Sequence, residues 1–182
     1  MRAMDYQKVI TFWFEEIEPK AWWKKDPEFD QLIADRFGEL HQAAARCECF
    51  GWRSEPLGRL AEIILLDQFS RNIGRDTPSA FANDPLALAL AQEAVRVSAD
   101  DTLDPIRKAF LYMPFMHSES EMIHQEAVAL FSQPGLESSL DFELRHKGII
   151  DRFGRYPHRN EILGRSSTVE ELEFLKQPGS SF

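Results

Sequence analysis

Histidine and carboxylate side chains precede an apolar stripe in the segment FMHSESEMIHQEAVALF, residues 115–131. If the segment is helical, His117, Glu121 and His124 share one face, because residues three and four apart are neighbours on a helix. Histidine can act as an acid or a base near neutral pH, and it can bind metal together with a carboxylate. The spacing differs from the HExxH pattern of zinc enzymes, so we favour a polar helix face and expect no structural metal.

A second polar group ends the apolar stripe of LAEIILLDQFSRN, residues 60–72. Asp67 and Arg71 are one helical turn apart and can form an ion pair, which in most proteins is structural rather than catalytic. The stripe of residues 115–131 has the reverse order, polar first and apolar later. If the two helices pack antiparallel, their polar ends meet. The pattern therefore predicts that Asp67 or Arg71 contacts the turn from His117 to Glu121.

The segment DRFGRYPHRN, residues 151–160, is basic in a chain whose net charge is −9. It contains Arg152, Arg155, His158 and Arg159, and it ends at Asn160. Planar guanidinium groups suit carboxylate and phosphate ligands. Structural ion pairs with carboxylates of the protein itself are an equally good interpretation, because such networks resemble binding sites.

His146 lies in the apolar stripe of the helix that we expect before this basic segment. A lone histidine in such a stripe is more often a hydrogen-bonded core residue than a catalyst. The chain has no nucleophile elbow and no phosphate-cradling glycine loop, so we assign no catalytic residue and expect no cofactor. The candidate ligand-binding residues are Asp67, Arg71, His117, Glu121, His146, Arg152, Arg155, His158 and Asn160.

Aspartate–proline pairs mark where the helices that position these residues begin. Asp26-Pro27, Asp84-Pro85 and Asp104-Pro105 each place a hydrogen-bond acceptor before a proline whose missing N–H costs nothing in the first turn. Helical spacing of apolar residues, without sustained period-two alternation, predicts an all-α chain. The expected helices cover about residues 5–14, 27–47, 54–72, 85–97, 105–113, 114–133, 139–153 and 169–176.

Length and composition predict a single domain spanning residues 1–182. Of these residues 43% are hydrophobic, which suffices for a sizeable core, and no linker rich in glycine, serine and proline divides the chain. Short loops favour helices paired antiparallel. A degenerate array of helical hairpins is a second arrangement that fits the pattern.

The charge and the thiols bear on partners and location. A net charge of −9 argues against nucleic acid and anionic membrane as partners. The longest apolar run, residues 109–116, is far shorter than the ~20 residues of a membrane helix, and the N-terminus lacks a secretory pattern. Cys47 and Cys49 are too close for an unstrained disulfide. We interpret them as reduced thiols and expect a cytoplasmic protein.

Three segments together resemble a largely bacterial family known as domain of unknown function nine-two-four. They are GRLAEIILLDQFSRNIGRDTPSAFANDPLALAL, FLYMPFMHSES and HKGIIDRFGRYPHRNEILGRSSTVEELEFL, and the similarity extends from Phe12 to Leu175. The resemblance implies a fold of about eight helices similar to tetratricopeptide-type hairpins, and no established activity. Family members tend to carry an aromatic residue at Gly74, so the loop that follows is expected to pack differently here. Polar residues within these segments are Asp67, Arg71, His117, Glu119, Arg152, Arg155, His158 and Asn160.

Three functions fit these observations. We favour binding of a small anionic ligand in a polar pocket, with catalysis undecided. The first alternative is a helical scaffold that binds a peptide or protein. The second is a hydrolase-type enzyme that uses histidine as acid or base and arginine as an anchor. A pocket holding His117, Arg155 and His158 would favour a ligand or substrate, whereas full mutual hydrogen bonding without a cavity would favour a purely structural cluster.

Overall fold

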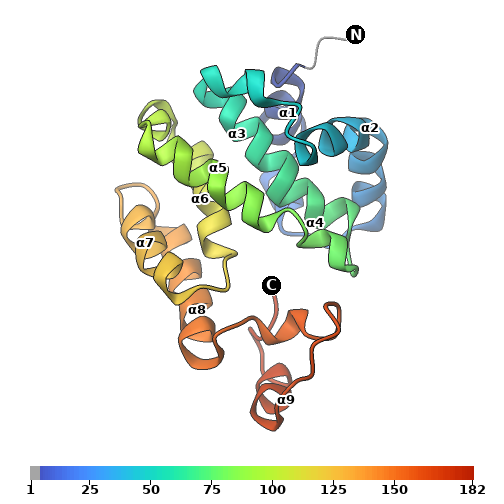
Figure 1. The fold of residues 1–182 in the computed structure, drawn as a ribbon, viewed down its shortest axis with the longest axis vertical. Coiled ribbons are helices and arrows are strands. Elements are labelled where there is room, and N and C mark those ends of the chain that lie inside the picture. The colour runs from blue at the N-terminus through green and yellow to red at the C-terminus, as the bar shows by residue number, and fades with distance from the viewer. Residues whose placement is uncertain (1–4) are drawn as a thin grey trace.

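The structure is a computed structural model that describes residues 5–182, and these residues form helices and no β-strand (Figure 1). The prediction of an all-α fold built from helical hairpins is therefore confirmed. The α-helices are α1 (Gln7–Thr11), α2 (Pro27–Ala45), α3 (Pro56–Ile64), α4 (Ser70–Ile73), α5 (Asp84–Arg96), α6 (Pro105–Met116), α7 (Glu121–Phe131), α8 (Glu137–Phe153) and α9 (Val169–Leu175). Shorter helical turns are η1 (Phe12–Glu16), η2 (Pro19–Trp22), η3 (Phe50–Ser54), η4 (Leu65–Phe69), η5 (Pro78–Ala80), η6 (Ala99–Thr102) and η7 (Pro157–Arg159).

Aspartate–proline pairs start two of the helices as expected. Asp26 accepts hydrogen bonds from the backbone N–H groups of Glu28 and Phe29, and Asp104 accepts one from Arg107. The third pair differs, because α5 begins at Asp84 itself and no side chain caps it. The Asp84 carboxylate is engaged elsewhere in the molecule, as described below.

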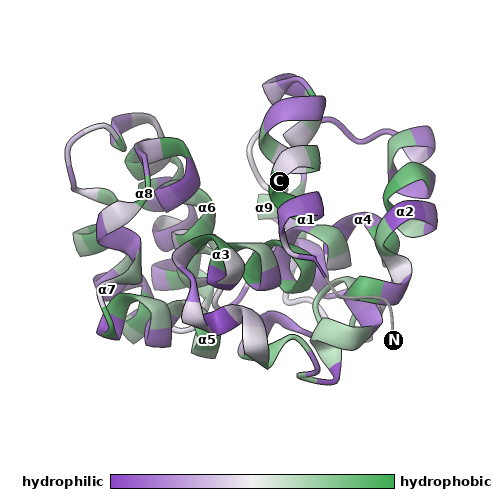
Figure 2. Ribbon diagram, turned by 90° about the horizontal axis from the view of Figure 1, so that it is seen from above, coloured by the Kyte–Doolittle hydropathy of each residue, from purple (hydrophilic) through white to green (hydrophobic). Residues whose placement is uncertain are grey.

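The core is formed where α3 and α6 pack against their neighbours. α3 lies against α5 and α6, while α7 packs between α6 and α8. Aromatic rings fill the centre, with Trp13 5.4 Å from Phe69 and 5.7 Å from Phe110 between ring centroids. Figure 2 shows hydrophobic and hydrophilic residues following one another along the helices. Among residues 5–182, no helix is long and apolar enough to cross a membrane.

Three of the expected helices are interrupted. The first, expected for residues 5–14, consists of α1 followed directly by the π-helical turn η1. Residues 54–72 form α3, then the π-helical turn η4, then α4, so the helix is not a single α-helix. Pro114 does not restart a helix, because it lies in the last turn of α6, which ends at Met116. Ser120 is extended, with φ −117° and ψ 120°, and α7 begins only at Glu121. The single helix face predicted for residues 117–128 is therefore wrong.

The loop after α4 approaches Gly74 closely. A Cβ atom at Gly74 would lie 2.5 Å from Ser79 Oγ and 2.6 Å from the backbone nitrogen of Ala80. An aromatic side chain at this position would require a different path for the loop. This agrees with the expectation, drawn from the family resemblance, that the loop packs differently in this chain.

The C-terminal segment returns from α8 toward the other helices (Figure 1). Ile149, Ile150 and Tyr156 form a small apolar cluster of their own, against which Phe153 and Phe174 pack. α9 begins as expected after Thr168, whose side chain accepts a hydrogen bond from the Glu171 backbone at 3.1 Å. α9 itself packs on η7, so the segment is a small layer added to the main helical core.

Candidate functional site

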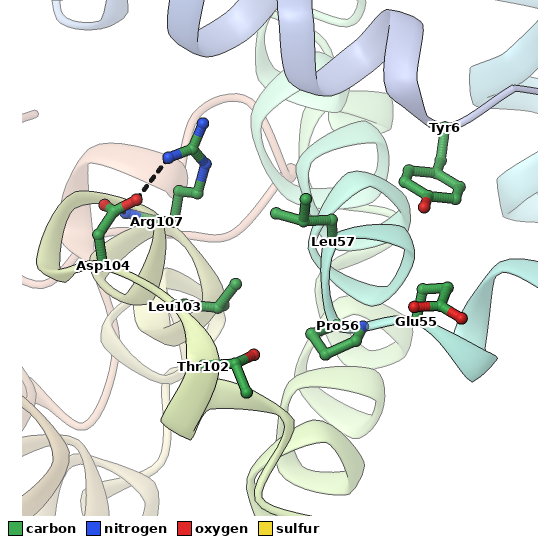
Figure 3. A pocket seen from close by; sticks show the side chains of 8 residues that line it. All are labelled: Tyr6, Glu55, Pro56, Leu57, Thr102, Leu103, Asp104 and Arg107. Carbon is green, nitrogen blue, oxygen red and sulfur yellow. Dashed lines mark hydrogen bonds and ion pairs between the residues drawn. The ribbon is translucent and has the colours of Figure 1, made fainter.

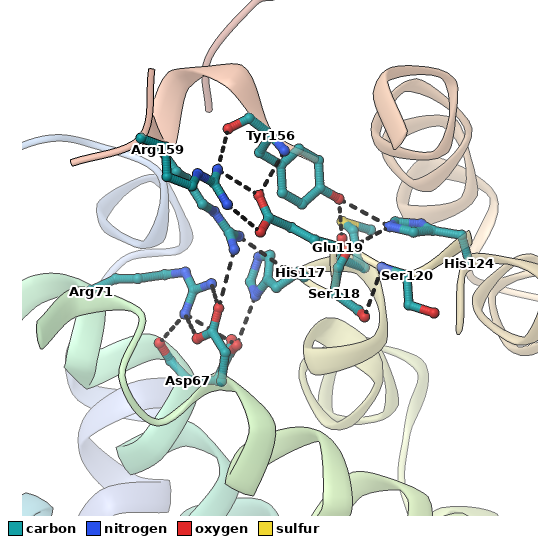
Figure 4. A network of polar contacts seen from close by, with 12 residues as sticks. Asp67, Arg71, His117, Ser118, Glu119, Ser120, His124, Tyr156 and Arg159 are labelled. Carbon is teal, nitrogen blue, oxygen red and sulfur yellow. Dashed lines mark hydrogen bonds and ion pairs between the residues drawn. The ribbon is translucent and has the colours of Figure 1, made fainter. Parts of the chain in front are cut away.

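A buried polar cluster forms where η4, the end of α6 and η7 meet (Figure 4). Asp67 accepts hydrogen bonds from His117 Nδ1 and from Gln68 Nε2, each at 2.7 Å. Arg71 Nη1 donates to the carbonyl of Asp67 at 2.9 Å and to its Oδ1 at 3.3 Å. The prediction that Asp67 or Arg71 contacts the His117 turn is confirmed.

The π-helical turn η4 sets the direction of the Asp67 side chain. Leu65, Leu66 and Phe69 of this turn are fully buried in the core, and Asp67 is itself only 1% exposed. A π turn inserts an extra residue per turn, which shifts the faces that follow it, and such turns occur often at functional sites. Asp67 faces the end of α6, where it contacts His117.

Asp67 and His117 are held as a carboxylate and a neutral imidazole. Burial opposes ionisation of Asp67, but the neighbouring His117 and Arg71 outweigh it and hold the pKa of Asp67 below its usual range. Burial, followed by the charge of Arg71, lowers the pKa of His117. Because the carboxylate can only accept, the imidazole proton lies on Nδ1. The other ring nitrogen, Nε2, is left with a lone pair that can accept a proton.

Arg159 enters the cluster from η7 and is a buried cation with few partners. Its side chain is 6% exposed. The guanidinium carbon lies 4.5 Å from the ring centroid of Phe81 and 4.6 Å from that of Tyr156. Nη2 donates to the carbonyl of His117 at 3.1 Å, and Nη1 reaches Asp84 Oδ2 only at 3.4 Å. Nε is buried without a hydrogen-bond partner among the residues described.

The carboxylate of Asp84, which Arg159 approaches, forms a closer ion pair with Arg71. Arg71 donates to Asp84 Oδ1 at 2.9 Å and to Asp84 Oδ2 at 3.0 Å, which is a bidentate pair. Burial, and then repulsion from Arg71, lower the pKa of Arg159. The charge of Arg159 is therefore less well compensated than that of Arg71.

The ring of Phe182 contacts three aromatic side chains and stays partly exposed. Ring centroids of Phe182 lie 3.7 Å from His146, 4.6 Å from His158 and 5.1 Å from Tyr156. His146 Nδ1 donates to the carbonyl of Phe142 at 2.7 Å. Burial lowers the pKa of His146 to about 3 and that of His158 to about 4, so both rings are neutral. His158 Nδ1 is buried and lacks a hydrogen-bond partner within the described chain.

A second buried network fixes the turn between α6 and α7. His124 Nε2 donates to the carbonyl of Ser118 at 2.8 Å, and its Nδ1 lies 2.7 Å from Glu143 Oε1. Tyr156 donates its hydroxyl proton to the carbonyl of Met116 at 2.5 Å. Burial raises the pKa of Glu143. Through these contacts His124 connects Glu143 of α8 to the turn that follows His117.

Several candidate residues lie outside the cluster. Glu121 is exposed at the start of α7, because the chain turns between residues 117 and 120. Arg152 is exposed and pairs with Glu170 at 2.8 Å. Including Glu121 and Arg152 in one site with Asp67 was wrong, since neither side chain reaches it.

Arg155 and Asn160 belong to a neighbouring network centred on Glu171. Arg155 Nε and Nη2 donate to the two carboxylate oxygens of Glu171 at 2.7 and 2.8 Å, and Nη2 also donates to the carbonyl of Ser166. Asn160 donates to Glu171 at 3.3 Å and accepts from Arg165 at 2.9 Å. The Arg155 fork is thus filled by a protein carboxylate, which is the structural alternative that the sequence left open.

Some residues of the cluster were not among the candidates. Asp84 was interpreted as a helix cap, and its pairing with Arg71 gives no signal in the sequence. Arg159 was recognised in the basic segment but was not separated from its neighbours. Tyr156 and Phe182 carried no signal at all, because their role depends on a C-terminal segment that folds back over α8.

Within residues 5–182, no three histidine, cysteine, aspartate or glutamate side chains converge in a way that could hold a metal. The structure also has an open cleft of about 440 Å³ that lies away from the polar cluster, between α3 and the start of α6 (Figure 3). Tyr6, Leu57 and Leu103 line it together with Arg107, which donates to Asp104 at 2.5 Å. Glu55 and Thr102 also line the cleft, so its wall carries polar as well as apolar groups.

Fold and cluster together define a class of all-helical protein in which a buried arginine–aspartate–histidine cluster closes one end of the helical core. The chain belongs to the family described as bacterial protein of unknown function (DUF924), which matches residues 9–179. Among solved structures, the protein of unknown function ATU0120 from Agrobacterium tumefaciens is similar, with 40% sequence identity and a TM-score of 0.89. The match covers 94% of this chain and 96% of that one. No curated protein matches the chain.

Proposed function

We propose that the protein binds a small anionic ligand at Arg159, beside the Asp67–His117 pair. One observation carries this proposal: the buried Arg159 guanidinium has an Nε without a hydrogen-bond partner among the described residues, and its Nη1 approaches Asp84 only to 3.4 Å. A buried cation without a close partner is costly, and a carboxylate or phosphate group on a ligand would complete its hydrogen bonds.

The contrast with Arg155 supports this choice of residue. Arg155 contacts both oxygens of Glu171 within 2.8 Å and needs no further partner. Both arginines come from the same basic segment, yet Arg159 alone of the two is buried between aromatic rings. A small anion that displaces the long Asp84 contact would gain a planar donor group in a site that is shielded from solvent.

Thermal unfolding in phosphate tests the proposal. At a phosphate concentration of 100 times Kd, binding should stabilise the protein by about 2.7 kcal/mol, whereas sodium chloride of equal ionic strength should do less because screening is not specific. Arg159→Lys keeps the charge but loses the planar fork, so the phosphate-specific rise in Tm should disappear. Arg155→Lys is the matched control and should keep that rise. Equal shifts by phosphate and chloride in all three proteins would refute an anion site.

A second candidate function is acid–base catalysis, which the Asp67–His117 hydrogen bond favours. Asp67 orients the imidazole and leaves Nε2 unprotonated, as a general base requires. A panel of phosphate and carboxylate esters would test this candidate, with His117→Gln as the variant. We expect turnover of one ester class to fall by at least ~100-fold in the variant, within the usual range for loss of a general base. Turnover that is unchanged in His117→Gln would exclude this role.

We also propose a cytoplasmic, single-domain protein without a nucleic-acid partner. The net charge of −9 supports the absence of nucleic-acid binding. Cys47 and Cys49 are free thiols, and burial raises the pKa of Cys49 to about 11, so it stays unreactive. Salt-dependent retention on a nucleic-acid column would contradict the first part of this proposal.

A further inference from the structure

We propose that the anion bound at Arg159 carries an aromatic ring, and that this ring takes the place that Phe182 now fills. The inference rests on the anion site proposed above and names the chemical class of its ligand, an aryl phosphate or aryl carboxylate. We call the space between His146, Tyr156 and His158 the ring slot.

The ring slot is built to hold a flat apolar group. His146 and His158 are kept neutral by burial, so they present ring faces and edges rather than charge. Tyr156 meets Phe182 edge to face, with an angle of 84° between the ring planes, and its hydroxyl is turned away toward Met116. Such edge-to-face contacts are favourable for any aromatic ring, whichever molecule supplies it.

The ring slot and Arg159 share one wall. Tyr156 contacts the Arg159 guanidinium as well as the Phe182 ring. His158 directly precedes Arg159, and its buried Nδ1 has no hydrogen-bond partner among the described residues. A ligand whose ring lies in the slot can therefore place an anionic group toward Arg159 and offer a hydrogen-bond partner to His158.

Phe182 is held loosely enough to be displaced. Its side chain is 54% exposed, so it buries much less surface than a ring enclosed on both sides would. Among the described residues, a single hydrogen bond holds residues 178–182, from Ser180 Oγ to the carbonyl of Leu175 at 3.1 Å. A competing aromatic ligand would therefore have to displace only a weakly held ring.

Calorimetric titration with phenyl phosphate and methyl phosphate tests the inference, because the two differ only in the group attached to the phosphate. We expect phenyl phosphate to bind about tenfold more tightly to the unmodified protein, as burial of a ring predicts. Phe182→Ala empties the slot and should tighten phenyl phosphate by a further factor of at least about three. Its affinity for methyl phosphate should not change.

Phe142→Ala is the matched control, since Phe142 is 53% exposed on α8 and its ring does not contact the slot. It should leave both affinities unchanged, while Phe182→Trp, which fills the slot with a larger ring, should weaken phenyl phosphate. If both phosphates bind with equal affinity in every variant, the aromatic inference is wrong although the anion site stands. If neither binds, the anion site itself has failed.

Discussion

The burial of His146 makes the stability of the folded protein depend on pH. The pKa of this histidine is lowered by burial to about 3 in the folded protein, whereas an unfolded histidine titrates near 6.5. Between these two values the unfolded chain binds a proton that the folded protein does not, so acid favours unfolding. The stability that the neutral ring contributes is complete above about pH 6.5 and is lost as the pH falls toward 3.

We therefore expect the free energy of unfolding, measured with urea, to fall between pH 6.5 and 4 by up to about 1.4 kcal/mol per pH unit for each such histidine. His146→Gln keeps a donor for the Phe142 carbonyl but cannot titrate, so its slope should be shallower by about that amount. The remaining slope comes from His41, His117 and His158, whose pKa values are also lowered by burial, and from carboxylates with lowered pKa values such as Glu119. Identical slopes in the two proteins would show that His146 is protonated in the folded state.

At the level of elements, Gly74 fixes how α4 meets the loop that follows. We expect Gly74→Ala to destabilise the protein by roughly 1–3 kcal/mol, the usual cost of forced overpacking. The reason is that the new Cβ atom would lie 2.6 Å from a backbone nitrogen, which cannot move aside as a side chain can. Urea or thermal unfolding measures the change.

Gly38→Ala in α2 is the internal control for Gly74→Ala. A Cβ atom at Gly38 meets nothing within 4 Å, and alanine is favoured over glycine inside a helix by about 1 kcal/mol. This variant should be slightly more stable than the parent. A stable Gly74→Ala protein would mean that residues 79–80 can shift at little cost.

The sequence located helices wherever a local signal exists. Asp26 and Asp104 cap their helices, Thr168 begins α9, and Gly154 ends α8 with a φ of 68°. η4 could not be foreseen, because its residues fit an α-helix equally well and only packing selects the π turn. The break at residues 117–120 was missed for a related reason, since the stretch contains neither glycine nor proline.

Part of the site was also within reach of the sequence. The contact of Asp67 and Arg71 with His117 was predicted correctly, but the reason differs, because His117 ends α6 and does not begin the polar stripe of a following helix. The contact of Arg159 with Asp84 was not accessible, since the two residues are 75 positions apart. Periodicity describes faces of helices and does not say which distant loops meet.

For the whole molecule, Glu119 connects the turn after α6 to the C-terminal segment. It accepts hydrogen bonds from the Tyr156 backbone at 2.7 Å and from both Nη atoms of Arg165, at 2.7 and 2.9 Å. We expect Glu119→Gln to loosen residues 154–182 and to speed their cleavage in limited proteolysis at least about fivefold, which corresponds to ~1 kcal/mol of local opening. Glu170→Gln, which alters an exposed pair, should be cleaved like the parent. Unchanged cleavage in both variants would show that the hydrogen bonds of Glu119 do not hold the segment.

The docking of Arg159 also bears on the order in which the chain assembles. Its partners Phe81 and Asp84 lie more than seventy residues earlier in the chain, and contacts of such separation close late in folding because their loop entropy must be met first. During synthesis, the earlier helices can pack before residue 159 has emerged. Asp67, Asp84 and His117 are then already in position when the last segment folds and brings Arg159 into contact with Asp84. Anion binding would consequently appear only in fully folded chains. In a refolding experiment its onset would mark the completion of folding rather than the initial collapse of the chain.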